Sequence, residues 1–309
     1  MKNTMPSSKK WNPNTNDKSS LVIPAAILAH IFWGFSFMAS RVALDTTNMF
    51  ILLSHRFLIA FLVLTILIVL GVAEVNIRGK SLMPLFWLGV MEPVVYFVGE
   101  YYGILHSNTI FSGVMIAMIP IVSTLAATVF LKEMPTLAQM IFSIISVGGV
   151  IGIGSISSSS GQLEFLGVIA LVVAVLSAVI YTLIGRRYSA EYSPFERTYC
   201  MMAMGAVVFT IIAVFQCEGN PMNYVIPFNK GGYTASVLFL AILCSVGSYF
   251  LNAFTITYLT VARQTVFANL TTAVSVFAGA VLLNEPFTPM GLLFCAMILL
   301  GIYGVQKTG

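Results

Sequence analysis

Runs of about 20 apolar residues, separated by short polar stretches, follow one another along the whole chain. A helix of that length spans the hydrocarbon core of a bilayer, which is about 30 Å thick. The pattern therefore predicts ten membrane-spanning helices, at residues 21–40, 49–71, 81–104, 109–131, 137–154, 162–185, 194–216, 235–259, 264–283 and 288–305.

The segments outside these runs are polar. Residues 1–20 are basic and rich in Asn, Ser and Pro, which predicts a disordered tail. A signal peptide is not expected, because the apolar run that follows ends at Arg41 and has no small-residue cleavage site. The longest connection, 217–234, holds two prolines and a Gly pair and is predicted to be a loop on the outer side. Shorter turns are expected at Gly79, Pro135, 157–161 and Pro286.

Composition excludes a water-soluble protein. Hydrophobic residues make up 58% of the 309 residues and charged residues only 8%, whereas soluble domains carry about 25% charged residues. The net charge of +4 is too small to indicate nucleic-acid binding. The four cysteines show no ligand-like spacing. We therefore expect no metal, no cofactor and no disulfide.

The distribution of Lys and Arg predicts the orientation, because basic connections stay in the cytoplasm. With the N-terminus inside, Arg41 and Lys230 fall outside and Arg56 lies within a span. The other 12 of the 15 basic residues then fall inside: Lys2, Lys9, Lys10, Lys18, Arg78, Lys80, Lys132, Arg186, Arg187, Arg197, Arg263 and Lys307. Both termini are therefore predicted to be cytoplasmic, in a multi-pass protein of the plasma or inner membrane.

An internal repeat divides the chain. Eleven of the 39 positions from 114 to 152 carry the same residue as the position 152 further on. The matches include charged and glycine positions, which apolar composition alone does not explain: Val114/Val266, Val122/Val274, Ser123/Ser275, Ala126/Ala278, Val129/Val281, Leu131/Leu283, Glu133/Glu285, Thr136/Thr288, Phe142/Phe294, Gly149/Gly301 and Gly152/Gly304.

The repeat and the helix count together predict the architecture. Five spans per repeat is an odd number, so residues 21–154 and 162–305 cross the membrane in opposite senses. The fold class is therefore an all-α integral membrane protein with ten transmembrane helices in two inverted five-helix repeats. Inverted repeats are typical of alternating-access carriers, whose substrate site lies between the halves near the midplane.

Several motifs resemble the EamA family of the drug/metabolite transporter superfamily. They are the LKE and LNE endings at 131–133 and 283–285, Pro120 within the fourth span, Trp33-Gly34, Arg56-Phe57 and the glycine-spaced last helix. The resemblance covers about residues 21–305. It implies a ten-helix secondary transporter that commonly exports amino acids or other small metabolites.

Two acidic residues lie well inside a span, and ionisable groups there are functional candidates. Glu92 and Glu100 are eight residues apart with Tyr96 between them, which places all three along one side of a helix. The repeat maps them onto Cys244, Ser248 and Asn252, so both halves present a polar stripe towards a shared cavity. Glu92 could couple protons or hold a substrate amine. Alternatively, a protonated Glu92 could bond to a carbonyl left free by Pro93.

Arg56 and Glu100 are expected at similar depths near the outer surface. A structural ion pair between them is the simpler interpretation. In the alternative, Arg56 binds a substrate carboxylate.

Further polar or aromatic residues are weighed against packing roles. His30 could relay protons, Trp33 and Tyr181 could form cavity walls, and Asn269 has a side chain that is costly to bury. Glu133 and Glu285 are expected to stabilise helix ends, for example by pairing with a basic residue of a nearby connection. The full candidate set is His30, Trp33, Arg56, Glu92, Tyr96, Glu100, Tyr181, Ser248, Asn252 and Asn269.

The sequence thus predicts an alternating-access transporter, and an exporter, of small metabolites such as amino acids. No Walker motif is present, so transport would be facilitated or coupled to a proton or counter-substrate. Lipid and a small-molecule substrate are the expected partners, and the glycine-rich helices leave a homodimer open. An enzyme is disfavoured because the three histidines are scattered. A receptor-like or structural membrane protein would instead have sealed polar stripes, and a channel would have a continuous pore.

Overall fold

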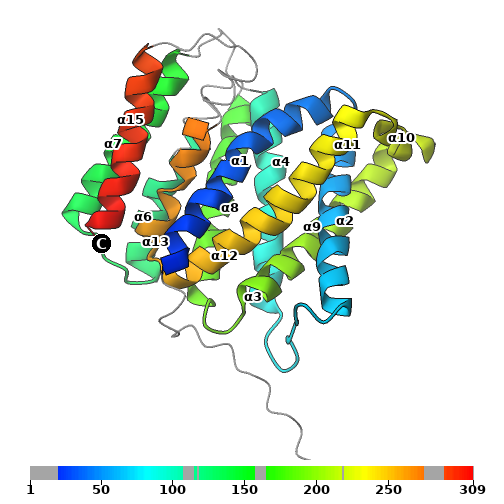
Figure 1. Cartoon of the computed structure of the whole chain (residues 1–309), viewed down its shortest axis with the longest axis horizontal. Coiled ribbons are helices and arrows are strands. Elements are labelled where there is room, and N and C mark those ends of the chain that lie inside the picture. Colours follow the sequence, from blue (N-terminus) through cyan, green and yellow to red (C-terminus); the bar gives the residue numbers. More distant parts are fainter. Residues whose placement is uncertain are drawn as a thin grey trace, which may run out of the picture.

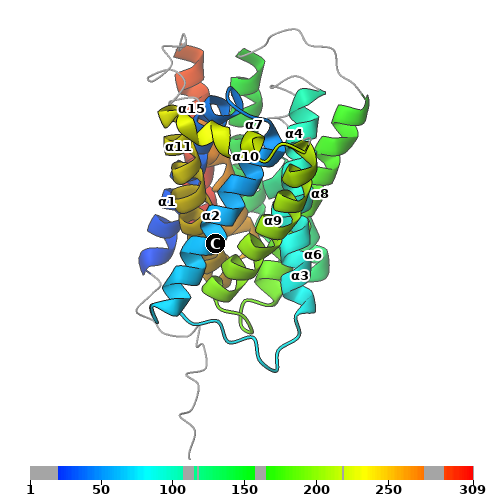
Figure 2. The same ribbon diagram turned by 90° about the vertical axis from the view of Figure 1, so that its right-hand side faces the viewer.

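The computed structural model describes residues 20–106, 115–116, 118–156, 165–217, 219–274 and 289–308. The predicted tail, apart from Ser20, and the turns at 157–161 and Pro286 lie outside these residues, as does Glu285. The described helices run side by side in one bundle (Figures 1 and 2). Figure 1 places the N-terminal end of α1 and the C-terminal end of α15 at its lower end.

The first half of the bundle precedes residue 157. Its elements are α1 (Val22–Leu44), α2 (Met49–Val69), α3 (Met83–Gly89), the π-helical turn η2 (Val90–Val95), α4 (Tyr96–Leu105), α6 (Ile119–Phe130) and α7 (Leu137–Ile156). The second half contains α8 (Phe165–Arg187), α9 (Pro194–Gln216), α10 (Met222–Val225), η3 (Ile226–Asn229), α11 (Gly231–Leu238), η4 (Phe239–Ser248), α12 (Tyr249–Tyr258), α13 (Val261–Thr265) and α15 (Pro289–Lys307).

Six helices among the described residues are long and apolar enough to cross a membrane: α1, α2, α8, α9, the joined α11–η4–α12 and α15. Two more apolar helices, α6 and the first part of α7, are shorter. These findings confirm an all-helical, multi-spanning protein. The full count of ten spans remains a prediction.

Polar and apolar side chains are placed as a lipid environment requires. Leu137 and Phe215 are largely exposed on the outside of the bundle, whereas Arg56, Ser54 and Thr198 are buried within it. In water this arrangement would be unfavourable, but hydrocarbon favours apolar contact outside and satisfied polar groups inside.

The last helices of the two halves pack against each other reciprocally. A Cβ added to Gly149 of α7 would lie 2.7 Å from the Phe294 carbonyl oxygen of α15, and one on Gly301 would lie 2.6 Å from the Phe142 carbonyl oxygen. These glycines and phenylalanines are repeat partners. Gly152 and Gly304 likewise face the rings of Phe294 and Phe142. Residue numbers rise along α7 as they fall along α15, so the two helices run antiparallel.

This contact predicts a sharp difference between two neighbouring glycines. A Gly149→Ala side chain would meet backbone, and overpacking of this kind costs about 1–3 kcal/mol. At Gly148 a new Cβ would meet only the Met297 methyl group, at 3.7 Å. We expect Gly149→Ala to lower the melting temperature in detergent and Gly148→Ala to leave it unchanged or raised. Equal melting temperatures would contradict this packing.

Two predicted helices are less regular than the sequence pattern suggested. The span predicted at 81–104 is interrupted at Glu92, whose backbone is extended (φ −144°, ψ 116°). The reason is Pro93, which cannot donate the helical hydrogen bond. The span predicted at 235–259 begins earlier, at Gly231, and contains the π-helical η4.

The prediction that 217–234 is a loop is wrong in part, because α10, η3 and the start of α11 lie in this segment. Its aromatic residues fold onto the start of α2. Tyr224 hydroxyl lies 2.7 Å from Ser54 Oγ, and Tyr233 hydroxyl lies 2.7 Å from His55 Nδ1. Phe228 packs beside the His55 ring, 4.5 Å between centroids. Burying these rings organises a segment whose polar composition indicated a loop.

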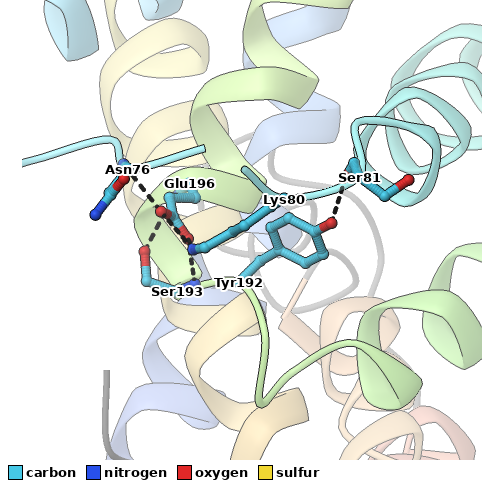
Figure 3. Close-up of polar contacts among 6 residues, drawn as sticks. All are labelled: Asn76, Lys80, Ser81, Tyr192, Ser193 and Glu196. Atoms are coloured by element: carbon cyan, nitrogen blue, oxygen red, sulfur yellow. Dashed lines mark hydrogen bonds and ion pairs between the residues drawn. The ribbon is translucent and has the colours of Figure 1, made fainter. Parts of the chain in front are cut away.

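A polar cluster joins the connection after α2 to the start of α9 (Figure 3). Ser193 and Glu196 form a capping box, which satisfies free N–H groups at the start of that helix. Lys80 Nζ lies 2.9 Å from Glu196 Oε1, and the Asn76 N–H donates to the same oxygen at 3.0 Å. Tyr192 hydroxyl donates to the Ser81 carbonyl. The cluster therefore links the connection between α2 and α3, in the first half, to α9 in the second half.

Candidate functional site

A cavity of about 810 Å³ lies between the two halves of the bundle. Its walls come from α1, α2, η2, α4, α8, α12 and α13, with one residue each from the ends of α6 and α9. It extends to the connection between α1 and α2, where Asp45 and Asn48 are exposed, so it opens at that end. Towards the opposite end, the described lining stops at Thr182, Asn252 and Gln264.

Glu92 reaches this cavity from the break in the third span. Its carboxyl group accepts a hydrogen bond from the Tyr249 hydroxyl of α12, with 2.6 Å between oxygens. The side chain is buried, and its hydrogen bond joins the two halves. Tyr249 is held edge-on against Trp33 of α1, 5.2 Å between ring centroids. A buried carboxyl group is thus positioned on the cavity wall by the opposite repeat.

Glu100 lies two turns further along α4 and also faces the cavity. Its Oε1 accepts a hydrogen bond from the Tyr96 hydroxyl at 2.9 Å, as the four-residue spacing allows. Glu92, Tyr96 and Glu100 therefore all line one wall, as the stripe predicted.

Arg56 provides the opposite charge. Its Nε donates to Ser245 Oγ at 2.7 Å, and its guanidinium group lies 4.9 Å from the centre of the Phe97 ring. The ion pair predicted between Arg56 and Glu100 is not formed. Within the described residues, the ion pairs shorter than 4 Å are Lys80–Glu196 and Arg186–Glu133. No described group bonds to the two terminal nitrogens of Arg56, which lines the cavity.

A series of hydrogen-bonded polar side chains lies at the end of the cavity away from Asp45. Asn252 Nδ2 donates to the Tyr181 hydroxyl at 3.3 Å, and Gln264 Nε2 donates to Asn252 Oδ1 at 2.6 Å. These three residues come from α12, α8 and α13 and are all buried. Each of them takes part in these hydrogen bonds, so the cavity floor is polar and its side chains are linked to one another.

Two predicted residues of α1 form an aromatic wall. Trp33 Nε1 donates to the Cys244 carbonyl at 3.2 Å, which orients the indole ring. His30 Nδ1 lies 3.1 Å from Thr271 Oγ1, and its ring packs against Trp33 at 5.0 Å. Both residues line the cavity.

Two candidates lie outside the lining. Ser248 is fully buried and donates to the Leu243 carbonyl of its own helix at 3.1 Å. Asn269 Nδ2 donates to Ser146 Oγ at 2.9 Å, and Ser146 Oγ donates in turn to the Ile298 carbonyl. Asn269 thus braces the α7–α15 contact. Both side chains are occupied by structural hydrogen bonds.

Two important cavity residues were not singled out from the sequence. Tyr249 follows Ser248, the position that the repeat matches to Tyr96, and the π-helical η4 turns Tyr249 inward instead. Gln264 lies at a predicted helix start, where a polar residue is ordinary. No signal in the sequence therefore distinguished it.

Glu133 acts at a helix end, as predicted. Its Oε1 accepts from Arg186 Nε at 2.6 Å, and its Oε2 accepts from the Val261 backbone N–H at 2.8 Å. Glu133 follows α6, whereas Arg186 lies at the end of α8 and Val261 begins α13. This carboxylate therefore ties the first half to two helices of the second.

A bundle of apolar helices around a polar, charged cavity defines a multi-spanning membrane protein with an internal cavity of small-molecule size. The sequence comparisons specify the class. A model of the EamA-like transporter family matches residues 20–155 and 165–306, one match for each half, so the chain belongs to this family.

Individual relatives agree with this assignment. The chain is 31% identical over 285 residues to the uncharacterized transporter YcxC of Bacillus subtilis, with 91% of each chain covered. It is 27% identical to a probable terminal-alkyne amino-acid exporter of Streptantibioticus cattleyicolor, covering 94% of this chain and 93% of the relative. A solved crystal structure superposes with a TM-score of 0.76 at 15% identity, covering 93% of this chain and 97% of that one, which supports the fold.

Proposed function

We propose that this protein is a secondary transporter that exports small zwitterionic metabolites, amino acids above all, by alternating access. The observation that carries the proposal is the cavity between the halves, whose buried lining includes one guanidinium group, Arg56, and two carboxyl groups, Glu92 and Glu100, beside aromatic rings. Ionisable groups inside a membrane-spanning bundle are costly, so their presence in this cavity supports a functional role.

The charges match the two ends of an amino acid. The free edge of the Arg56 guanidinium group can bind a carboxylate through two parallel hydrogen bonds. Glu92 or Glu100 can accept from the ammonium group, and Arg56 lies near them because its guanidinium group packs on Phe97 of the helix that carries Glu100. Trp33, Tyr96 and Tyr249 would then contact the apolar part of the substrate. The relative named as a probable terminal-alkyne amino-acid exporter supports this substrate class.

Alternating access would follow from the predicted inverted repeats of five spans each. The antiparallel, reciprocal contact of α7 with α15 supports a two-fold relation between the halves. Two similar halves in opposite orientation can exchange conformations, so that an outward-open form becomes an inward-open one at nearly equal energy. The glycine faces of α7 and α15 are used within the chain, which favours a scaffold role over a homodimer interface.

The orientation of the termini is proposed from the basic residues. The end with the N-terminus of α1 and the C-terminus of α15 would face the cytoplasm, and the cavity in this structure would open outward. A cysteine at Asn223, in the exposed part of the 219–230 segment, should react with an impermeant maleimide on intact cells lacking other accessible thiols. Reaction only after permeabilisation would reverse the orientation.

A receptor or a channel would make different use of the cavity. A receptor-like or structural protein would seal its polar stripes, whereas this cavity reaches the exposed Asp45 and Asn48. A channel would need a continuous pore, whereas the described lining of this cavity ends at the hydrogen-bonded Asn252 and Gln264. A carrier with one end open fits both observations.

Purified protein in liposomes tests the proposal. Vesicles loaded with a labelled aromatic or branched amino acid should lose it faster than protein-free vesicles, and unlabelled amino acid on the other side should change the rate by exchange. A thermal-shift screen would identify the best substrate, because a ligand stabilises the state that binds it. The function would be contradicted if every amino acid tested gave no flux and no thermal stabilisation. A proton gradient, applied separately, would show whether the coupling partner is a proton or a counter-substrate.

A further inference from the structure

A hydrogen-bonded cluster lies below the cavity floor. Glu133 binds Arg186 Nε at 2.6 Å and the Val261 N–H at 2.8 Å. Arg186 also donates through one terminal nitrogen to the Thr257 and Ile256 carbonyls, at 3.0 and 3.3 Å. These carbonyls end α12, where a cation is favourable. One carboxylate and one guanidinium group thus join the ends of α6, α8, α12 and α13.

The cluster lies one helical turn beyond the lining of the cavity on each second-half helix. Thr182, Asn252 and Thr265 line the cavity. Arg186, Ile256 and Val261 each lie four residues away from one of them along the chain. On the far side, Glu133 borders a second, smaller cavity of about 230 Å³, which Arg263 and Thr260 also line. The cluster therefore separates two spaces that a substrate path through this end would connect.

A comparison with the other charged contacts at this end shows what is particular about the cluster. Arg197 also donates to α12, at the Ala253 carbonyl and Thr257 Oγ1, but Arg197 and α12 belong to the same half of the chain. The Lys80–Glu196 ion pair also joins the two halves (Figure 3). It lies beside α2 and α9, which contact each other further along as well, through the stacked Phe57 and Phe209 rings and the Ser54–Thr210 hydrogen bond. Only Glu133 among these carboxylates holds the two halves together beneath the cavity.

We infer that the Glu133–Arg186–Val261 cluster is a latch that must open in each transport cycle to connect the cavity with this end of the protein. The inference rests on the proposed transport function. Glu133 and Arg186 are then positioning residues: they set the balance between the two open forms and do not touch the substrate. Both side chains keep partial exposure, 21% and 24%, so water can replace their contacts when the helices part.

Sided labelling tests the latch without any substrate. In a variant with Cys200, Cys217, Cys244 and Cys295 replaced, Ala268→Cys places a thiol on the cavity wall. An impermeant maleimide is applied to right-side-out and to inside-out vesicles. With the latch intact, labelling should be faster from the Asp45 end. Glu133→Gln and Arg186→Gln should each raise labelling from the latch end about fivefold, as expected for a partly exposed ion pair.

The double variant and the controls make the result specific. If both residues act as one latch, Glu133→Gln with Arg186→Gln should change labelling no more than either alone. Glu133→Asp keeps the charge and should give a smaller change. Lys80→Gln breaks the neighbouring ion pair and should leave latch-end labelling unchanged. Labelling from the Asp45 end verifies that each variant is folded.

Two failures remain distinguishable. If Glu133→Gln labels from the latch end no faster than Lys80→Gln, the latch is refuted and the transport function stands. If Ala268→Cys reacts from neither end, the cavity is not accessible and the transport function itself is contradicted.

Discussion

Arg56→Gln should reduce amino-acid flux in liposomes by about 10- to 100-fold, the range expected when a charge-assisted hydrogen-bonded pair is lost. Arg56 is anchored by Ser245 and supported by the Phe97 ring, which leaves its terminal nitrogens available to the cavity. Arg56→Lys keeps the charge but loses the two-pronged donor geometry, so it should recover only part of the flux. Uptake or efflux of radiolabelled substrate measures the effect.

A substrate pair separates binding from structure. For the unmodified protein an amino acid should compete well, and its methyl ester, which lacks the carboxylate, should compete poorly. In Arg56→Gln the amino acid and its methyl ester should compete equally well, because the guanidinium group that distinguishes them is gone. If Arg56 were instead a structural partner of Glu100, the double variant Arg56→Glu with Glu100→Arg would restore the flux lost in either single variant. Restored flux in that variant, or an unchanged preference for the acid, would refute carboxylate binding.

Glu92→Gln should remove the response of transport to a pH gradient while the protein remains folded. Glu92 is the buried carboxyl group where the third span is broken, and Tyr249 donates to it from the other half. Glutamine has a similar shape but cannot gain or lose a proton near neutral pH. Flux measured in liposomes with and without a pH difference should therefore become the same.

The same variant separates the two roles open to Glu92. If it couples protons, exchange of labelled for unlabelled amino acid should continue in Glu92→Gln. If it holds the substrate ammonium group, exchange and thermal stabilisation by amino acids should both be lost. Tyr249→Phe keeps the carboxyl group and should keep a pH response. Glu100→Gln is the matched carboxyl control, and an undiminished pH response in Glu92→Gln would exclude Glu92 from coupling.

The outcome for individual residues shows how far sequence patterns reach. The spacing of Glu92, Tyr96 and Glu100 placed all three on one cavity wall correctly. Transferring that stripe to the second half was less successful, because only Asn252 of its three counterparts lines the cavity. A one-residue shift in the π-helical η4 directs Tyr249 inward and leaves Ser248 bonded to its own helix.

Hydropathy and the internal repeat determined the class of this protein before any coordinates: helical, membrane-spanning and built from two related halves. The family was identified from the resemblance of its motifs, and the family model confirms it. These properties are local or periodic, because each residue's preference for lipid or water is set by its own side chain. The tertiary structure alone decided which groups meet. Glu92 and Tyr249 are 157 residues apart, and Glu133 and Val261 are 128 apart. Such contacts depend on how whole helices pack and bend, which no local pattern encodes.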